Sequence, residues 1–521
     1  MVILLAGLMG ATVASGQAKI RKLPGNLNHP AINNYAPYIS LDGNSLVYLS
    51  DLGEDHALAL TYSVRQGVNW KDPFVMPRNI GHKLNFMRGF GLSPDGRTLY
   101  LSNMKSNGMG GFDIYASQLK GTQWDEPVNM LLPVNSKENE ACPSLSLDGT
   151  AFYYMRCDKM DINSASGCRI LVMKKKPNGQ WDAPVELPAY INTGNSQAPR
   201  IMSDGEMLIF SSDRIQPNRG GMDLYFTRLV DGQWSRPEPL DFANTASDDC
   251  FISSTSSGMY LLKDVPGQRS NELVEYLFPP EIRPKGTLKV EGSVTGVPDP
   301  SLTYITVYRL PEKTKAITLQ PSKDGTFQVY MNYGRHYQLA IEPADGHYTF
   351  SSKAYDLRGE SNSMVDRFEV HLEPVKPGLV FELTDVEFES GSSILMPSAA
   401  LELSRISRMI EGNPDRSFSI EVTLFGFQQD SIRSNPDLTE VAYDTTRIPI
   451  VYQVDSATTA TRDSIVVRSR FHNDRTLQQA KAIAAQLIKD GTNPGRLASS
   501  GKALAEAIPE KRRTSIQVIA H

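Results

Sequence analysis

Few side chains in this sequence have types and spacings suited to catalysis. It contains no Gly-x-Ser-x-Gly and no His-Glu-x-x-His, motifs that hold a nucleophile or a metal beside a base. The eight histidines lack metal-ligand spacing. Asp248 and Asp249 form an acidic pair, but neighbouring residues of a strand point to opposite faces. We therefore expect no enzymatic activity, no metal and no cofactor.

The four cysteines predict one disulfide at most. Cys157 and Cys168 flank an expected hairpin loop and are the candidate pair, in an oxidising compartment that permits such bonds. Cys142 and Cys250 occupy similar positions in two repeats and are expected to be buried free thiols. No Cys-x-x-Cys occurs, so the cysteines do not indicate a zinc site.

A repeat in the first half of the chain defines the elements that carry these residues. The tryptophans recur every 53 to 57 residues, each followed three places later by proline, at Trp70, Trp124, Trp181 and Trp234. Asp-Gly turns between apolar runs indicate hairpins, so each repeat is read as four strands. Proline suits an outer edge strand. The pattern predicts a β-propeller over residues 17–280, with the tryptophans packed between blades in a structural role.

The last repeat indicates how the ring closes. A fifth unit begins at Asp248 but lacks the tryptophan strand. Residues 18–28 resemble the sequence that follows the tryptophan in other repeats. We therefore predict that this N-terminal segment supplies the missing outer strand and completes five blades, since an open sheet edge is a liability. A sixth blade would need sequence that we do not find.

Two further domains follow a proline-rich linker at 279–284. Alternating apolar positions and an Asp-Gly turn predict a small β-sandwich at 286–375. Residues 377–521 predict a two-layer α/β domain in β-α-β-α-β order. Its expected elements are a strand at 379–388, a helix capped by Ser398, a strand at 418–424, a helix from about Asp474 to a C′ residue at Gly491, and a strand at 516–520.

Each domain resembles a known family. Ser93-Pro94-Asp95-Gly96 and the strand at 110–115 resemble the WD40-like propellers of TolB-type proteins, which mostly bind proteins. The stretch 322–327 resembles carboxypeptidase regulatory-like domains, which act as spacers or docking surfaces. The last domain resembles the OmpA C-terminal, peptidoglycan-associated family. The residues that carry this last resemblance are Val386-Glu387-Phe388, Ser393, Pro397, Arg496-Leu497, Gly501 and the pair Arg512-Arg513.

The OmpA-like resemblance implies a wall-binding site that this chain carries in altered form. The family binds the diaminopimelate of a stem peptide with an aspartate in Gly-His-Thr-Asp and an arginine in the second helix, because the ligand carries a carboxylate and an ammonium. Here Gly426 opens a segment ending in Gln429, with Asp430 one place late, and Gln479 aligns with the arginine. Asp430 with Arg475 or Lys481 are candidate substitutes, and a polar insert spans about 430–470.

The N-terminus and the charge indicate where the protein works. Residues 1–16 are apolar, end in small residues and predict a signal peptide, with a buried first strand as the other interpretation. No cysteine follows to carry a lipid, no segment is long enough to span a membrane, and the net charge of −5 does not indicate nucleic acid as a partner. A start codon further upstream is also compatible with the sequence, since the usual positive n-region is missing.

These features predict a non-catalytic periplasmic scaffold associated with the outer membrane. The propeller would hold a protein partner, and the OmpA-like domain would associate with peptidoglycan. The domain order is similar to that of a type IX secretion component of Bacteroidota-type bacteria, although the helical-repeat module and lipid anchor of that component are not found here. The alternative is a propeller enzyme, or a glycan or small-molecule binder, with a purely structural OmpA-like domain that docks a protein.

Overall fold

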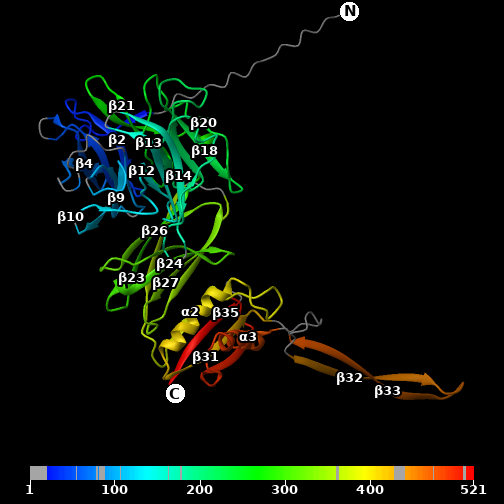
Figure 1. Ribbon diagram of the computed structural model, residues 1–521. Helices are drawn as coiled ribbons and strands as arrows, with labels where there is room; N and C mark the ends of the chain where they lie inside the picture. The colour runs from blue at the N-terminus through cyan, green and yellow to red at the C-terminus, as the bar shows by residue number, and fades with distance from the viewer. Residues whose placement is uncertain are drawn as a thin grey trace, which may run out of the picture. The chain divides into compact units, whose positions relative to one another are not determined.

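The computed structural model divides the chain into two compact units (Figure 1). It describes residues 20–53, 56–77, 80, 89–94, 96–105, 107–121, 123–161, 164–176, 179–359, 363–427, 440–472, 474–508 and 512–520. One unit comprises Met1–Val290, Gln328–Gly334 and Gly359–Asp366, and the other comprises the remaining residues. The predicted signal segment lies outside the described residues. No described helix is long and apolar enough to cross a membrane.

The described residues of the first unit form five antiparallel sheets, one for each sequence repeat. The first two hold β2 (Asn34–Ile39), β3 (Ser45–Ser50), β4 (Ala59–Gln66), β5 (Asn69–Trp70) and β6 (Phe74–Val75), then β7 (Phe90–Leu92), β8 (Thr98–Asn103), β9 (Asp113–Lys120), β10 (Gln123–Trp124) and β11 (Val128–Asn129). The third and fourth hold β12 (Asn139–Leu145), β13 (Ala151–Met160), β14 (Ala165–Lys174) and β15 (Val185–Glu186), then β16 (Ser196–Ile201), β17 (Met207–Ser212), β18 (Asp223–Val230), β19 (Gln233–Trp234) and β20 (Glu238–Pro239). The fifth is built from β1 (Ile20–Lys22), β22 (Asn271–Leu277) and β21 (Tyr260–Pro266).

The chain's N-terminal segment completes the last sheet. β1 pairs antiparallel with β22, with Ile20 opposite Tyr276. The core between the last and first sheets is shared as well, since Leu262 and Leu273 cluster with Leu46 and other residues of the first sheet. The sheets therefore close into a β-propeller, and the predicted pairing of the N-terminal segment with the last repeat is confirmed.

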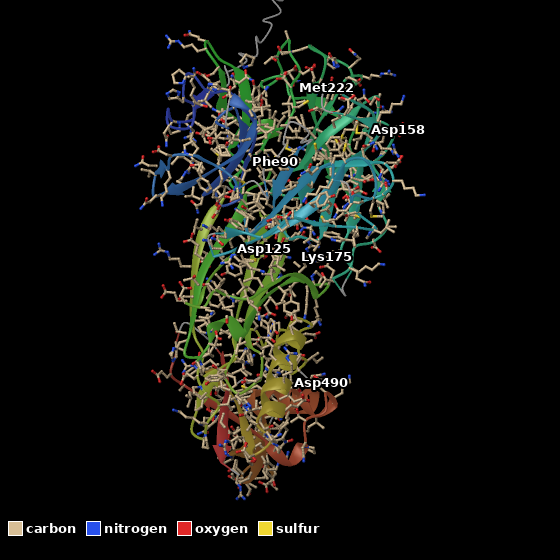
Figure 2. The ribbon with its side chains drawn as sticks, turned by 60° about the vertical axis from the view of Figure 1, so that its left-hand side comes forward. Phe90, Asp125, Asp158, Lys175, Met222 and Asp490 are labelled. Atoms are coloured by element: carbon tan, nitrogen blue, oxygen red, sulfur yellow. A yellow bond between two sulfur atoms is a disulfide. The ribbon has the colours of Figure 1, made fainter. Side chains whose placement is uncertain are left out.

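Every tryptophan lies in a hydrophobic cluster built from two successive sheets. Trp124 meets Tyr62 of the preceding sheet edge to face, with ring centroids 6.5 Å apart. Trp234 meets Tyr153 of the preceding sheet in the same way at 6.2 Å. Edge-to-face pairs stabilise beyond the area they bury. The predicted structural role between sheets is thus confirmed. Figure 2 shows the packed side chains, with Phe90 inside the propeller.

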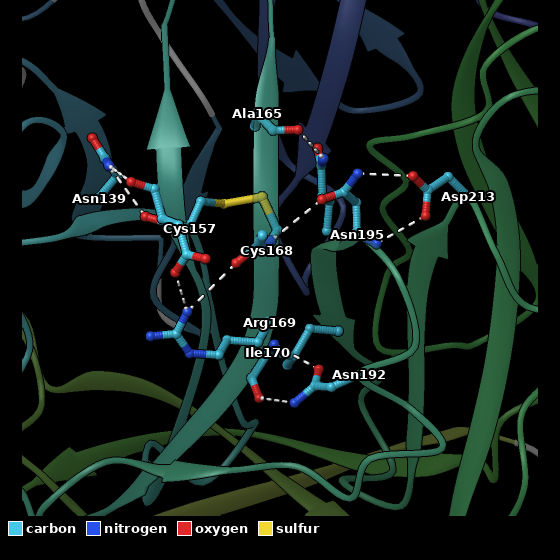
Figure 3. The surroundings of a disulfide bond; sticks show 12 residues. Asn139, Cys157, Ala165, Cys168, Arg169, Ile170, Asn192, Asn195 and Asp213 are labelled. Carbon is cyan, nitrogen blue, oxygen red and sulfur yellow. Dashed lines mark hydrogen bonds and ion pairs between the residues drawn. A yellow bond between two sulfur atoms is a disulfide. The ribbon is translucent and has the colours of Figure 1, made fainter.

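A recurring asparagine ties the loops that follow Trp124, Trp181 and Trp234, and the N-terminal segment, to their sheets, a feature that the sequence analysis missed. The Nδ2 of Asn192 donates to the carbonyl of Ile170 at 3.1 Å, and its Oδ1 accepts from the N–H of Ile170 at 2.8 Å (Figure 3). The asparagine thus bonds both the N–H and the C=O of one backbone residue, whose carbonyl also accepts from the N–H of Leu187 at 3.0 Å. The same two bonds are made by Asn28, Asn135, Asn192 and Asn244.

A disulfide joins Cys157 of β13 to Cys168 of β14, which face each other across the hairpin (Figure 3). The predicted bond is confirmed. Cys142 and Cys250 are free, and Cys142 is buried, as expected. Cys250 is half-buried and not fully buried as expected, although desolvation still raises the pKa of its thiol to about 12.

The middle of the chain is the predicted β domain. Two sheets have strand orders β26-β23-β29 and β25-β24-β27-β28. Their strands are β23 (Thr287–Thr295), β24 (Thr303–Leu310), β25 (Thr314–Leu319), β26 (Thr326–Asn332), β27 (Arg335–Pro343), β28 (Ser351–Leu357) and β29 (Met364–His371), with short 3-10 turns at Pro280–Ile282 and Pro300–Leu302.

In its described residues, the C-terminal domain is a four-stranded mixed sheet with two helices. Its sheet order is β30-β35-β31-β34, and β31 runs parallel to β34. The elements are β30 (Val380–Glu382), α2 (Ala399–Gly412), β31 (Arg416–Phe425), α3 (Thr476–Lys489), a 3-10 turn at Pro494–Arg496, β34 (Leu497–Leu504) and β35 (Arg512–Ala520). The two-layer α/β prediction is confirmed, and Gly491 follows α3 with a φ of 111°, as a C′ glycine does.

Four details of this domain correct the sequence analysis. β34 was not predicted, and the first strand is shorter than expected. The polar insert forms a long hairpin of β32 (Glu440–Gln453) and β33 (Thr459–His472). Ser398 precedes α2 but makes no capping bond, because it has helical backbone angles and its hydroxyl is buried without a partner among the described residues.

Candidate functional site

The predicted ligand positions that the structure brings together lie at one end of the C-terminal sheet. The chain passes from β31 through the hairpin and α3 into β34, which is parallel to β31, so α3 begins at the carboxyl end of β31. Gly426 follows β31 directly, and Arg475 immediately precedes α3. Arg512 begins β35 and lies opposite Leu424, near the same end. Ligands of α/β sheets commonly bind outside such carboxyl ends.

A glycine allows the helix to approach the sheet at this end. A Cβ on Gly501 of β34 would lie 2.3 Å from the backbone nitrogen of Leu477 and 2.4 Å from the Oγ1 of Thr476. Both residues belong to the first turn of α3. Because no side chain fits in that space, Gly501 fixes where α3 starts. It thereby fixes the place of Arg475, which is buried and has a left-handed backbone with φ of 52°.

The site is cationic. Partial burial lowers the pKa of the Arg512 guanidinium, although Arg512 keeps an exposed side, and the charge of Arg475 lowers it further. Asp474 acts in the opposite direction. The N-terminus of the 14-residue helix α3 adds partial positive charge. Two arginines that repel each other beside a helix N-terminus suit an anionic group such as a carboxylate.

Two other predicted residues lie away from this site. Arg513 forms an ion pair with Glu382, Nε to Oε1 3.0 Å, and its guanidinium lies over the ring of Phe425. As the strand neighbour of Arg512, it points to the other face of the sheet. Lys481 is exposed, and two residues of helix turn it about 200° from Gln479. Neither cation therefore contributes to the cluster.

Gln479 is the helix position at which the resembled family has arginine. Its side chain is fully buried, and its Nε2 donates to the carbonyl of Ser392 at 2.8 Å. Its Oε1 is buried without a partner among the described residues. The Gln479 side-chain amide therefore holds the loop before α2 through its NH2 group, and its carbonyl oxygen accepts no hydrogen bond from the described residues. Gln429 and Asp430 lie outside the described residues.

The axis of the propeller is closed by an arginine. Arg200 of β16 is buried, its Nε donates to the carbonyl of Ile252 at 2.9 Å, and its guanidinium lies 3.9 Å from the ring centroid of Tyr38. Burial lowers its pKa. The cavity lined by these inner-strand residues has a volume of about 20 Å³, which is space for about one water molecule.

A left-handed residue recurs in every repeat at intervals of 53 to 56 residues, within β2, β12 and β16, just before β7, and ahead of β21. The φ angles are 48°, 99°, 52°, 48° and 50° at Ala36, Gly89, Cys142, Ala198 and Phe251. The register of three of these strands shifts next to this residue, so it marks a β-bulge. The sequence could not predict these left-handed positions, because the five residues are of four different types and only one of them is a glycine.

The acidic pair considered for catalysis has structural partners. Asp249 is buried and ion-paired with the Nζ of Lys263, which is also buried. The Oδ1 of Asp248 accepts from the N–H of Met222 at 2.9 Å. Among the residues that the structure describes, no group of three or more His, Cys, Asp or Glu side chains is placed to hold a metal.

Comparisons with known proteins give weak matches. No family model matches the chain, and no curated protein matches it. Among solved structures, putative TolB from Agrobacterium tumefaciens is 18% identical over 57% of this chain and 90% of that chain, with a TM-score of 0.29. TolB from Acinetobacter baumannii is 14% identical over 47% of this chain and 54% of that chain, with a TM-score of 0.30. The GH43 endo-arabinanase from Bacillus licheniformis is 15% identical over 47% of this chain and 93% of that chain, with a TM-score of 0.32. At these scores the likenesses carry no argument, and the fold rests on the strand pairing.

Proposed function

We propose that this protein is a non-catalytic periplasmic scaffold with a five-bladed propeller. In this proposal the propeller holds a protein partner, and the C-terminal domain associates with peptidoglycan at the outer membrane. The packed axis supports a surface-binding role for the propeller, because its cavity of about 20 Å³ is too small for a sugar or peptide. The buried partners of Asp249 and Arg200 support a structural use of those charges.

The cationic end of the C-terminal sheet is the observation that carries wall association. Arg475, Arg512 and the start of α3 would hold the carboxylate of a stem-peptide diaminopimelate. Asp474 is the described carboxylate nearest to them along the chain and would face the ligand's ammonium, in place of the aspartate of the resembled OmpA-like family. The domain order resembles that of the type IX secretion component PorE, and we infer a role in such an envelope assembly.

Sedimentation with purified peptidoglycan sacculi tests the wall association. We expect the full chain to pellet with sacculi, and Arg475→Ala and Arg512→Ala each to reduce the pelleted fraction about tenfold, since each removes a charge-assisted bond of about 1.5 to 3 kcal/mol. Lys481→Ala is the matched control, because it removes an exposed cation on another face of α3. Equal loss in all three variants would indicate nonspecific charge attraction, and failure of the wild type to pellet would contradict wall association.

A further inference from the structure

The insert of the C-terminal domain forms a two-stranded ribbon that no other described strand joins. β32 and β33 pair over 14 residues each, and Figure 1 shows the ribbon leaving the domain. A lone strand pair is marginally stable in water. Its exposed apolar side chains, which are 42 to 67% exposed, are Tyr443, Ile448, Ile450, Val451, Tyr452, Val454, Ile465 and Val467. A ribbon that leaves this many apolar groups in water indicates an interaction surface.

The two edges of the ribbon differ. The N–H of Val454 donates to the carbonyl of Thr458 at 2.9 Å, so these residues form a hydrogen-bonded pair at the end of the ladder. Bonded and non-bonded pairs alternate along an antiparallel ladder, and the register is continuous. Pro449, five residues earlier, therefore lies in a non-bonded pair with Asp463 and turns its nitrogen outward. The edge of β32 thus lacks a donor at its middle, and edge prolines prevent strand addition.

The edge of β33 carries no proline that would prevent strand addition. By the same alternation, every second residue from Thr459 to Phe471 turns its N–H and C=O outward, and none of them is proline. These groups have no strand beside them among the described residues. Such a row of donors and acceptors is suited to binding an extended segment by strand addition.

The side chains of β33 specify what such a segment should carry. Arg462, Arg468 and Arg470 project to one face, and Ile465 and Val467 project to the other. Two of these arginines contact β32: Arg470 is ion-paired with Asp444, and the guanidinium of Arg462 lies over the ring of Tyr452. Residues directly opposite on an added strand interact most strongly. Acidic residues alternating with apolar ones would therefore match both faces at once.

We propose that the outer edge of β33 binds an extended segment of a partner protein in which acidic and apolar residues alternate. A second copy of β33 matches it poorly. Antiparallel pairing centred on Ile465 would place Arg462 opposite Arg468, and pairing centred on Val466 would place it opposite Arg470. Like charges directly opposite each other destabilise a strand pair. This inference is independent of the proposed wall association.

A pair of proline substitutions tests the edge. Val467 and Thr445 face each other in the ladder, both in non-bonded positions, so Val467→Pro and Thr445→Pro disturb the ribbon alike but remove donors from opposite edges. The probe is a fluorescent 13-residue peptide that alternates glutamate with valine, titrated with the full chain and followed by anisotropy. We expect Val467→Pro to weaken binding at least about tenfold, and Thr445→Pro to leave it within about twofold.

A charge reversal tests the preference for acidic residues. Arg468→Glu should weaken binding of the glutamate peptide about tenfold and improve binding of a matched lysine peptide. No binding of the wild type at about 1 mM peptide, or equal loss in both proline variants, would overturn the proposal. Dimerisation of the free protein that Val467→Pro abolishes would overturn it as well, because the occupant would then be a second copy.

Discussion

In the propeller, buried Lys263 meets buried Asp249, whereas at the start of α3 the charges of Arg475 and Arg512 oppose each other. The C-terminal domain can also pair buried charges, since Arg405 of α2 lies 2.9 Å from Glu402, both 2% exposed in their side chains. The difference therefore belongs to the sites and not to the domains. A buried ion pair stabilises a fold, whereas two neighbouring arginines at a helix N-terminus favour an anionic ligand.

The largest effect is expected from breaking the propeller's buried pair. Asp249→Ala should lower the free energy of unfolding by about 3 to 5 kcal/mol, because it leaves the buried Lys263 ammonium without its ion-pair partner. Urea unfolding followed by tryptophan fluorescence reports on this region alone, since all four tryptophans lie in the propeller.

A double variant separates charge from packing in that experiment. Asp249→Ala with Lys263→Met should recover most of the loss, because neither charge of the ion pair then remains buried. A loss below about 1 kcal/mol in the single variant would show that water reaches Lys263 and would remove the contrast with the arginine cluster.

The propeller was predictable because its signals are local and repeated. Asp-Gly turns and spaced tryptophans mark each sheet, and the segment after Lys22 resembles the same segment of other repeats. The clamp made by Asn192 was missed because its two partners are backbone groups of Ile170, 22 residues away, and carry no sequence signal.

The C-terminal site was only partly predictable, for physical reasons that differ by residue. Arg475 and Arg512 come together only through the parallel pairing of β31 with β34, and β34 was missed because Leu497–Leu504 is rich in small residues and half exposed. Lys481 was predicted as a candidate substitute because it lies two places after Gln479, but helix geometry turns it away from Gln479. The hairpin was hidden because apolar residues occupy both of its faces, so no period of two stands out.

The second prediction tests whether the helix start is held by close contact. Gly501→Ala should destabilise the C-terminal domain by about 1 to 3 kcal/mol, because its Cβ meets the backbone of α3 and the helix must shift. Hydrogen exchange in α3 peptides should rise, while the tryptophan-monitored unfolding of the propeller stays constant. Gly495→Ala is the control, since its nearest neighbour is the Oδ1 of Asn493 at 3.3 Å. Unchanged exchange in the Gly501 variant would show that the first turn of α3 is loosely placed.

The smallest effect concerns a propeller carboxyl whose ionisation burial opposes. Desolvation raises the pKa of Asp264 from 3.8 to about 6. Two interactions lower this pKa in part: the N–H of Ala36 donates to the Oδ1 of Asp264 at 3.0 Å, and Lys263 contributes a nearby positive charge. The folded state holds this proton more tightly than the unfolded state. The stability that the proton contributes is therefore complete below about pH 4 and is lost as the pH rises through 6.

Asp264→Asn keeps an acceptor for Ala36 and removes the titration. We expect the difference in unfolding free energy, variant minus wild type, to rise by about 1 to 2 kcal/mol between pH 4 and pH 7.5, measured by tryptophan fluorescence in urea. The two-unit shift corresponds to about 3 kcal/mol, and the smaller figure allows for the part of Asp264 that remains in contact with water. A difference that does not vary with pH would mean that Asp264 ionises freely.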